Sequence, residues 1–209
     1  MSYSDPFDEA LSEVSNGGFI HHILGSAYDS KRFKKYCKDI MSDKGSNKEK
    51  AANEVLFQAA TKMTLQGGGL GVFGGVGAIA AGGADITSLM YHVVETCGVL
   101  AEIYDLDTDD DNVKAFVLAG VSGDVNLTDK ALKLLDIGMN TTAREVALKP
   151  LVKTLLVPIL KAIGVKVSVR GGIKIAQLIP VAGAIVGGGA NCWMVNDIGH
   201  KFLKKLKQI

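Results

Sequence analysis

The sequence contains few of the residues that build catalytic, metal or disulfide sites. It has 3 cysteines, 4 histidines, 4 prolines and 1 tryptophan among 209 residues. Cys37, Cys97 and Cys192 are an odd number without a CxxC pair, which indicates buried thiols in a reducing compartment. No HExxH or GxSxG motif occurs. The spacing of these residues predicts no catalytic, cofactor or metal site, and it favours a non-enzymatic protein.

The start of the sequence also does not resemble a secretory leader. The first ten residues, MSYSDPFDEA, are polar and acidic, without a basic stretch followed by an apolar one. We therefore expect no signal peptide and a cytoplasmic protein. The length suits a single domain. Within it we expect residues 1–66 to form an N-terminal helical segment that packs on a core of residues 67–209.

The small net charge of +1 hides an uneven layout. Residues 67–145 carry 4 basic and 12 acidic residues, whereas residues 146–209 carry 10 basic residues and 1 acidic residue. Two explanations stay open: the basic end attracts the acidic middle, or it faces anionic lipid. The candidate membrane-facing residues are Lys149, Lys153, Lys161, Lys201, Lys204, Lys205 and Lys207.

Hydrophobic periodicity predicts an all-α, single-domain bundle of about eight helices with two central glycine-rich hairpins. One helix is expected over residues 19–42, followed by a polar loop over residues 42–50. We expect a helix cap near Asp110–Asn112 and another at Thr128. The acidic run at residues 105–111, DLDTDDD, fails as a calcium loop, because its sixth and twelfth positions are Asp110 and Phe116.

The first glycine-rich run, at residues 67–86, reads GGGLGVFGGVGAIAAGGADI. It lacks the lysine of a Walker loop and follows a helical pattern rather than a strand, so a nucleotide cradle is disfavoured. Gly67, Gly71 and Gly75 instead have the four-residue spacing that lets helices pack closely. We favour a buried hairpin, with membrane spanning and conditional insertion as the alternatives.

Five polar residues stand in or beside apolar segments and form a candidate polar core or ligand site: Asp85, Arg170, Asn191, Asn196 and Asp197. Buried carboxylates need partners, so a pairing of either aspartate with Arg170 is one possibility. A network that fixes helix register is favoured over a catalytic role.

Two motifs resemble those of the EcsC family. One is ADITSLMYHVVETCGVLAEIYDLDTDD, and the other runs from Arg170 through LIPVAGAIVGGGANCWMVNDIGHKF. Together they fall in Gly67–Phe116 and Arg170–Phe202, and the first departs from the family at Asp105, where glycine is frequent. The positions that match are Asp85, Arg170, Pro180, Gly183, Gly187 and Asn191. The resemblance implies an all-helical bacterial protein linked to an ABC transporter, secretion or membrane processes, with no established reaction.

We therefore expect a non-enzymatic, membrane-proximal interaction protein of the EcsC type, peripheral to the inner membrane. Its partner would be an anionic membrane surface or a membrane protein, with a lipid or small apolar ligand as a further possibility. One alternative is a ligand-binding protein or enzyme with a polar pocket at Asp85, Arg170 and Asn191. Another is a membrane-inserting effector or immunity-type protein. Nucleic acid is disfavoured as a partner, because the basic end has few aromatic residues.

Overall fold

The computed structural model describes residue 10 and residues 24–71, 77–140, 152–163 and 183–209. All regular structure in these ranges is helical, which confirms the predicted all-α class. The principal helices are α3 (Ser30–Asp43), α4 (Lys48–Gly71), α5 (Gly77–Ile103), α6 (Asp111–Ser122), α7 (Val125–Asn140) and α10 (Gly183–Leu206). Residues 152–163 are also helical.

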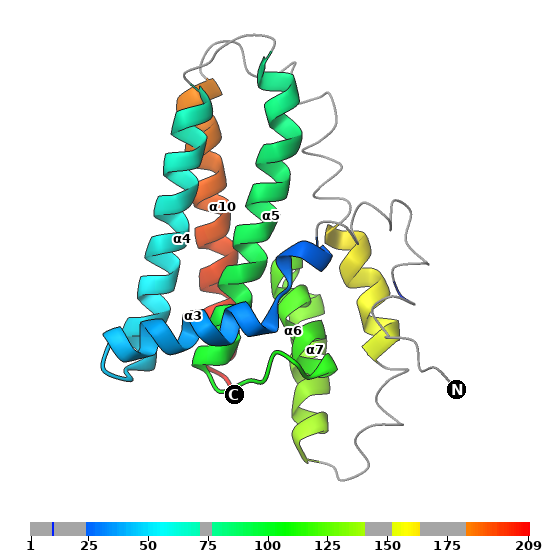
Figure 1. Cartoon of the computed structure of the whole chain (residues 1–209). Coiled ribbons are helices and arrows are strands. Elements are labelled where there is room, and N and C mark those ends of the chain that lie inside the picture. Colours follow the sequence, from blue (N-terminus) through cyan, green and yellow to red (C-terminus); the bar gives the residue numbers. More distant parts are fainter. Residues whose placement is uncertain (1–9, 11–23, 72–76, 141–151, 164–182) are drawn as a thin grey trace.

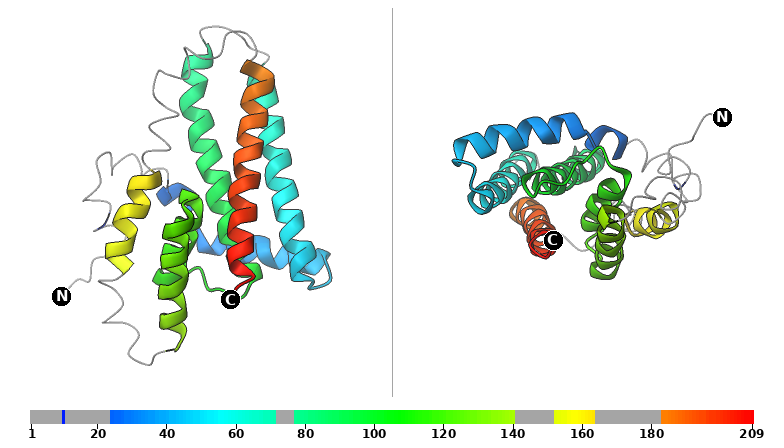
Figure 2. Two further views of the ribbon diagram at one scale, coloured as in Figure 1. Left: turned by 180° about the vertical axis from the view of Figure 1, so that it is seen from behind. Right: turned by 90° about the horizontal axis from the view of Figure 1, so that it is seen from below.

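Helices α4 and α5 stand side by side, and their two faces are covered by different helices (Figures 1 and 2). Helix α3 crosses one face, and α10 lies along the opposite face (Figure 2). Helices α6 and α7 pack beside α5 and α10. The most extensive contact joins α4 to α10, although they are far apart in the sequence. The glycine-rich hairpins stay a prediction, because residues 72–76 and 164–182 lie outside the described ranges.

Three glycines allow a large side chain of one helix to touch the backbone of another. A Cβ added at Gly98 would lie 2.4 Å from the Phe33 ring, and one added at Gly120 would lie 2.3 Å from Phe202 Cδ2. At the third, Leu56 of α4 fills the space beside Gly199 of α10. These contacts fix α3 on α5, α10 on α6 and α4 on α10, because no other residue leaves room for the side chain.

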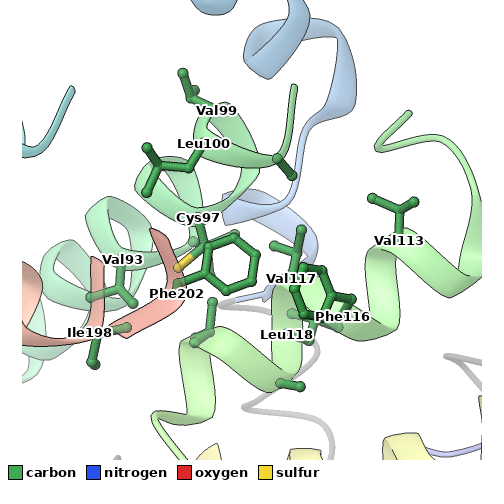
Figure 3. Close-up of a cluster of buried hydrophobic side chains, with 14 of the residues drawn as sticks. Val93, Cys97, Val99, Leu100, Val113, Phe116, Val117, Leu118, Ile198 and Phe202 are labelled. Atoms are coloured by element: carbon green, nitrogen blue, oxygen red, sulfur yellow. The ribbon is translucent and has the colours of Figure 1, made fainter. Parts of the chain in front are cut away.

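The largest side chain that α10 buries is Phe202, at the junction with α6. Its ring centroid lies 4.8 Å from that of Phe116 with a tilt of 40°. Figure 3 shows Phe116 and Phe202 among the aliphatic side chains of α5, α6 and α10, with the Cys97 thiol nearby. This cluster holds the last turns of α10 against α6.

The predicted cap near Asp110–Asn112 is confirmed, because the Asp110 carboxylate accepts hydrogen bonds from the backbone N–H groups of Asn112 and Val113. The predicted cap at Thr128 is wrong. Helix α7 begins at Val125, and the carboxylate of the preceding Asp124 accepts from its first turn. Thr128 lies inside the helix, and its hydroxyl donates to backbone carbonyls.

A single helix over residues 19–42 is also wrong, because the chain leaves helical geometry at Tyr28 and Asp29. Asp29 adopts an extended conformation and caps α3, and its carboxylate accepts from the N–H of Arg32. The Tyr28 hydroxyl donates to the Thr108 carbonyl at 2.9 Å. This bond ties the break to the loop before α6.

We expect Gly120→Ala to lower the free energy of unfolding by about 1–2 kcal/mol. A Cβ 2.3 Å from Phe202 Cδ2 overlaps the ring severely, so the overpacking cost is about 2–3 kcal/mol, in the upper part of the usual range, and it exceeds the gain of about 1 kcal/mol in helix propensity. Urea denaturation would measure the change. Gly25→Ala is the control, because nothing lies within 4 Å of a Cβ at Gly25. Equal or greater stability of Gly120→Ala would show that the helices are not held at this distance.

Candidate functional site

The five candidate polar residues have different outcomes in the structure. Asp85 lies in α5 and Asn191 in α10, but their side chains are outside the described part of the chain, as is Arg170 altogether. Asn196 is half-buried on α10. Asp197 accepts a hydrogen bond from Lys201, one helical turn later, at 2.6 Å. The described contacts therefore place Asp197 in a local surface pair, and the predicted polar site stays a prediction.

Three of the C-terminal lysines contact carboxylates of the protein itself: Lys201 with Asp197 at 2.6 Å, Lys205 with Asp129 at 2.5 Å and Lys207 with Glu49 at 2.9 Å. The Lys205 pair joins α10 to α7, and the Lys207 pair joins the residue directly after α10 to α4. Pairing with Glu49 raises the pKa of Lys207. Exposed pairs of this kind are worth about 0–1 kcal/mol, so a stronger anion competes with them readily.

The other four candidate lysines differ in their exposure. Lys204 is exposed, and no carboxylate in the described ranges pairs with it. Lys161 is exposed and Lys153 is half-buried in helical residues 152–163. Lys149 lies outside the described ranges. Three of the seven candidate lysines, Lys201, Lys204 and Lys205, therefore lie on α10, and Lys204 is the one of these three that no described carboxylate pairs with.

Helices α4 and α10 together present a surface that we call the outer face, on the side of this helix pair away from α5. Its exposed residues are Lys50, Asn53, Phe57, Trp193, His200 and Lys204. Leu56 and Glu49 mark the side of α4 that contacts α10. Lys50, Asn53 and Phe57 lie next to that side around the helix, in the direction away from α5. On α10 the spacing of Trp193, His200 and Lys204 places them on one exposed stripe. Figure 2 shows that no described helix covers this side of α10.

Two large apolar side chains project from the outer face. Phe57 and Trp193 are each 67% exposed, the highest values among the large apolar residues described. Trp193 is the only tryptophan in the chain. The exposure of both side chains could have been inferred from the sequence, because each aromatic residue shares its stripe of the helix with polar residues. Sequence reasoning missed it, because Trp193 stands in an otherwise apolar run.

A second group surrounds Glu95 of α5, on the side covered by α3. Arg32 Nε lies 3.3 Å from Glu95 Oε1, and Lys62 Nζ and His92 Nδ1 lie 3.9 and 3.8 Å from Oε2. The Arg32 guanidinium also lies 4.4 Å from the centroid of the Tyr91 ring. Burial alone would raise the pKa of Glu95, but contact with His92, Lys62 and Arg32 outweighs it and lowers the pKa.

The Glu95 group joins three helices, which favours a structural role. Arg32 lies on α3, Lys62 on α4, and both His92 and Glu95 on α5. Arg32 Nε and His92 Nδ1 are buried without a hydrogen bond. Both atoms are close to the carboxylate, so its negative charge compensates part of their desolvation.

We expect Glu95→Gln to lower the free energy of unfolding at pH 7 by about 1 kcal/mol or more, because two buried groups lose their counter-charge. The folded-state pKa of Glu95 is below the ordinary value of 4.5 for a glutamate. Its contribution is therefore complete above pH 4.5 and is lost as the pH falls through the folded-state pKa. The difference between variant and wild type should shrink below pH 4.5 in urea titrations.

Glu49→Gln is the matched control for that experiment. Glu49 is exposed and contacts the single cation Lys207, so its replacement should change stability less than Glu95→Gln does at pH 7. If the two variants behave alike, the Glu95 group does not hold the three helices together.

The acidic loop is neutralised by lysines of the protein itself. Lys34 contacts Asp107 at 2.7 Å and Asp109 at 2.5 Å, and Lys48 pairs with Asp105. These contacts lower the pKa values of Asp107 and Asp109. Asp105 has φ +63°, in the left-handed region that favours glycine. No cluster suited to a metal ion occurs in the parts of the chain that the structure describes.

A polar cleft of about 540 Å3 lies beside this loop at the start of α3. Its walls carry both signs of charge, including Asp29, Asp109, Lys31 and Lys114. Asp29 caps α3, and Lys114 lies 5.6 Å from the centroid of the Tyr28 ring. These contacts stabilise the junction of α3 with the loop and select no particular ligand.

Two of the three thiols, Cys37 and Cys97, are unsuited to nucleophilic chemistry. All are free, with Cys97 buried as predicted, while Cys37 and Cys192 are only half-buried. Burial raises the pKa of Cys97 and, together with Glu102 and Asp105, raises that of Cys37 to about 11. A thiol with a raised pKa is protonated at neutral pH and reacts slowly.

Comparisons of the chain with protein-family models, with curated proteins and with solved structures found no match. The resemblance to the EcsC family therefore stays a prediction from the two sequence motifs. In the described parts of the chain, no helix combines the length and the apolar character needed to cross a bilayer.

Proposed function

We propose that the protein is a non-enzymatic, membrane-proximal interaction protein that binds the surface of anionic membranes through the outer face of α4 and α10. The observation that carries the proposal is the exposure of Trp193 on the stripe of α10 that also bears Lys204. A helix surface that combines tryptophan with lysine is typical of helices that lie in the membrane interface. Phe57 of α4 adds a second apolar side chain to the same face.

The positions of these residues suit a helix that lies along the membrane. Trp193 and Lys204 are separated by about 16 Å along α10, at 1.5 Å per residue. The aromatic end of the stripe would enter the boundary between headgroups and acyl chains, and the basic end would contact lipid phosphates. In this orientation α3 and the acidic loop lie on the side away from the lipid (Figure 2), so the carboxylates of the loop are distant from the anionic surface.

The ion pairs of the C-terminal lysines are compatible with this role. Each juxtamembrane lysine is worth about 1 kcal/mol near an anionic surface, which is comparable to the strength of an exposed ion pair. The resemblance to the EcsC family favours the same class of function, since that family is linked to membrane processes. At Asp105, where the sequence departs from the family, the backbone has the conformation that favours the family's glycine.

The single tryptophan provides a direct test. On addition of vesicles that contain phosphatidylglycerol, we expect Trp193 fluorescence to shift to shorter wavelength and to lose accessibility to iodide, because the ring leaves water. Vesicles of phosphatidylcholine alone should produce little change, since they lack the charge that attracts the lysines. Flotation of the same mixtures would measure binding independently. If neither method detects binding to anionic vesicles, the proposal is wrong.

Replacement of four lysines by glutamine tests the electrostatic part. The variant Lys201→Gln, Lys204→Gln, Lys205→Gln, Lys207→Gln should bind anionic vesicles about 100-fold more weakly, from about 1 kcal/mol per lysine less the ion pairs already made. Lys35→Gln, Lys38→Gln on α3 is the control, because both side chains are exposed on the opposite side. Unchanged partitioning of the fourfold variant would contradict the proposal.

A further inference from the structure

A small pocket lies between the C-terminal half of α10 and the turn that joins α6 to α7. Its volume is about 190 Å3. Gly120 and Phe202 line it, as do Val125 and three lysines, Lys201, Lys204 and Lys205. It differs from the cleft at α3 because its lining is predominantly apolar and its charged residues are all cationic.

The apolar part of the pocket is built by features that also hold the fold. Phe202 is fixed against Gly120 and Phe116, so its ring provides a rigid wall. Gly123 ends α6 in the left-handed conformation, with φ +64°, and turns the chain into α7. Val125, the first residue of α7, is consequently 48% exposed at the pocket, although it is apolar.

The cationic part comes from a single turn of α10. Lys205 is the most buried of the three, with a side chain 19% exposed, and is held by Asp129. Lys201 is held by Asp197. Lys204 has no carboxylate partner in the described ranges and is exposed. The lining carries three cations and no carboxylate. Asp197 and Asp129 pair with two of these cations and the nearby Asp124 caps α7, so Lys204 is the cation available to one phosphate group.

We propose that this pocket binds the headgroup region of one anionic membrane lipid, a phosphate that carries an apolar chain. The phosphate lies against the three lysines, and the glycerol backbone and first methylenes contact Val125 and Phe202. A volume of about 190 Å3 accommodates about six water-sized groups at about 30 Å3 each. It is too small for an acyl chain, so the rest of the lipid remains in the bilayer.

The position of the pocket favours a lipid over a free phosphate or an acidic peptide. Lys204 belongs both to the pocket and to the exposed stripe of α10 that carries Trp193, so the pocket adjoins the outer face. A lipid in a membrane against that face already presents its phosphate at the lysines. The inference therefore rests on the proposed function and adds to it a specific site for one lipid molecule.

A soluble lipid tests the pocket without a membrane. Dihexanoyl phosphatidic acid, below its micelle concentration, should shift the amide resonances of α10 and of the start of α7 in heteronuclear NMR spectra. Val125→Asp should weaken this binding about tenfold or more, because it places a negative charge beside the phosphate. An aspartate in the first turn of α7 is favourable to the helix, so the variant is expected to fold. Asn47→Asp is the control, because it adds the same charge at an exposed helix cap that does not line the pocket, and it should bind as well as wild type.

Three further ligands test which chemical groups the pocket recognises. Glycerol 3-phosphate and dihexanoyl phosphatidylcholine should bind at least about tenfold more weakly, since one lacks the apolar chain and the other lacks net charge. Equal binding of glycerol 3-phosphate would overturn the inference in favour of a free-phosphate site. Tighter binding of an acidic peptide with one leucine would overturn it in favour of a protein partner. Equal binding to wild type and Val125→Asp would show that the lipid is elsewhere.

Failure of this inference is distinguishable from failure of the proposed function. Trp193→Ser should lose much of its affinity for anionic vesicles yet bind the soluble lipid normally, because Trp193 does not line the pocket. Vesicle binding without binding of the soluble lipid overturns the pocket and leaves the outer face. Binding of the soluble lipid without vesicle binding supports the pocket and overturns the proposed membrane role.

Discussion

The position of α10 depends on close contact at two glycines. Leu56 of α4 occupies the space that a side chain at Gly199 would need, and Phe202 occupies the corresponding space at Gly120 of α6. One contact draws α10 against α4, and the other draws it against α6. Because both contacts lie on the buried side of α10, the opposite side is left to carry Trp193 and the lysines. The exposed surface of the helix is thus a consequence of how its interior side packs.

Much of the helical architecture could be predicted from periodicity and capping chemistry. The cap at Asp110 was predictable, because aspartate is among the residues preferred at the N-cap of a helix and here it directly precedes an apolar segment. Thr128 misled the prediction because Asp124, a stronger acceptor, stands four residues earlier and begins the helix there. The break at Tyr28 was not predictable from local pattern, since it depends on a hydrogen bond to Thr108, eighty residues later. Long-range contacts of this kind override propensity.

The candidate site was predictable in part for the same reasons. The clustering of lysines at the C-terminus is a property of the sequence, and α10 indeed concentrates them on one helix. Which carboxylate each lysine contacts depends on packing, as in the pairing of Lys205 with Asp129 of α7 and of Lys207 with Glu49 of α4. The exposure of Trp193 also depends on packing, because an aromatic residue in an apolar run is usually buried. The group around Glu95 joins α3, α4 and α5, so no single segment reveals it.

Because the only tryptophan is exposed, the function of this residue is separate from the folding of the core, whereas most proteins combine the two at a tryptophan. A buried tryptophan contributes to the core, so any substitution alters folding and function together. Here the core is completed by Phe33, Phe116 and Phe202, while the indole of Trp193 lies outside it. Position 193 is therefore free to change during evolution at little cost to stability. Under the proposed function, substitutions at position 193 would change the affinity for the membrane surface without repacking a single helix.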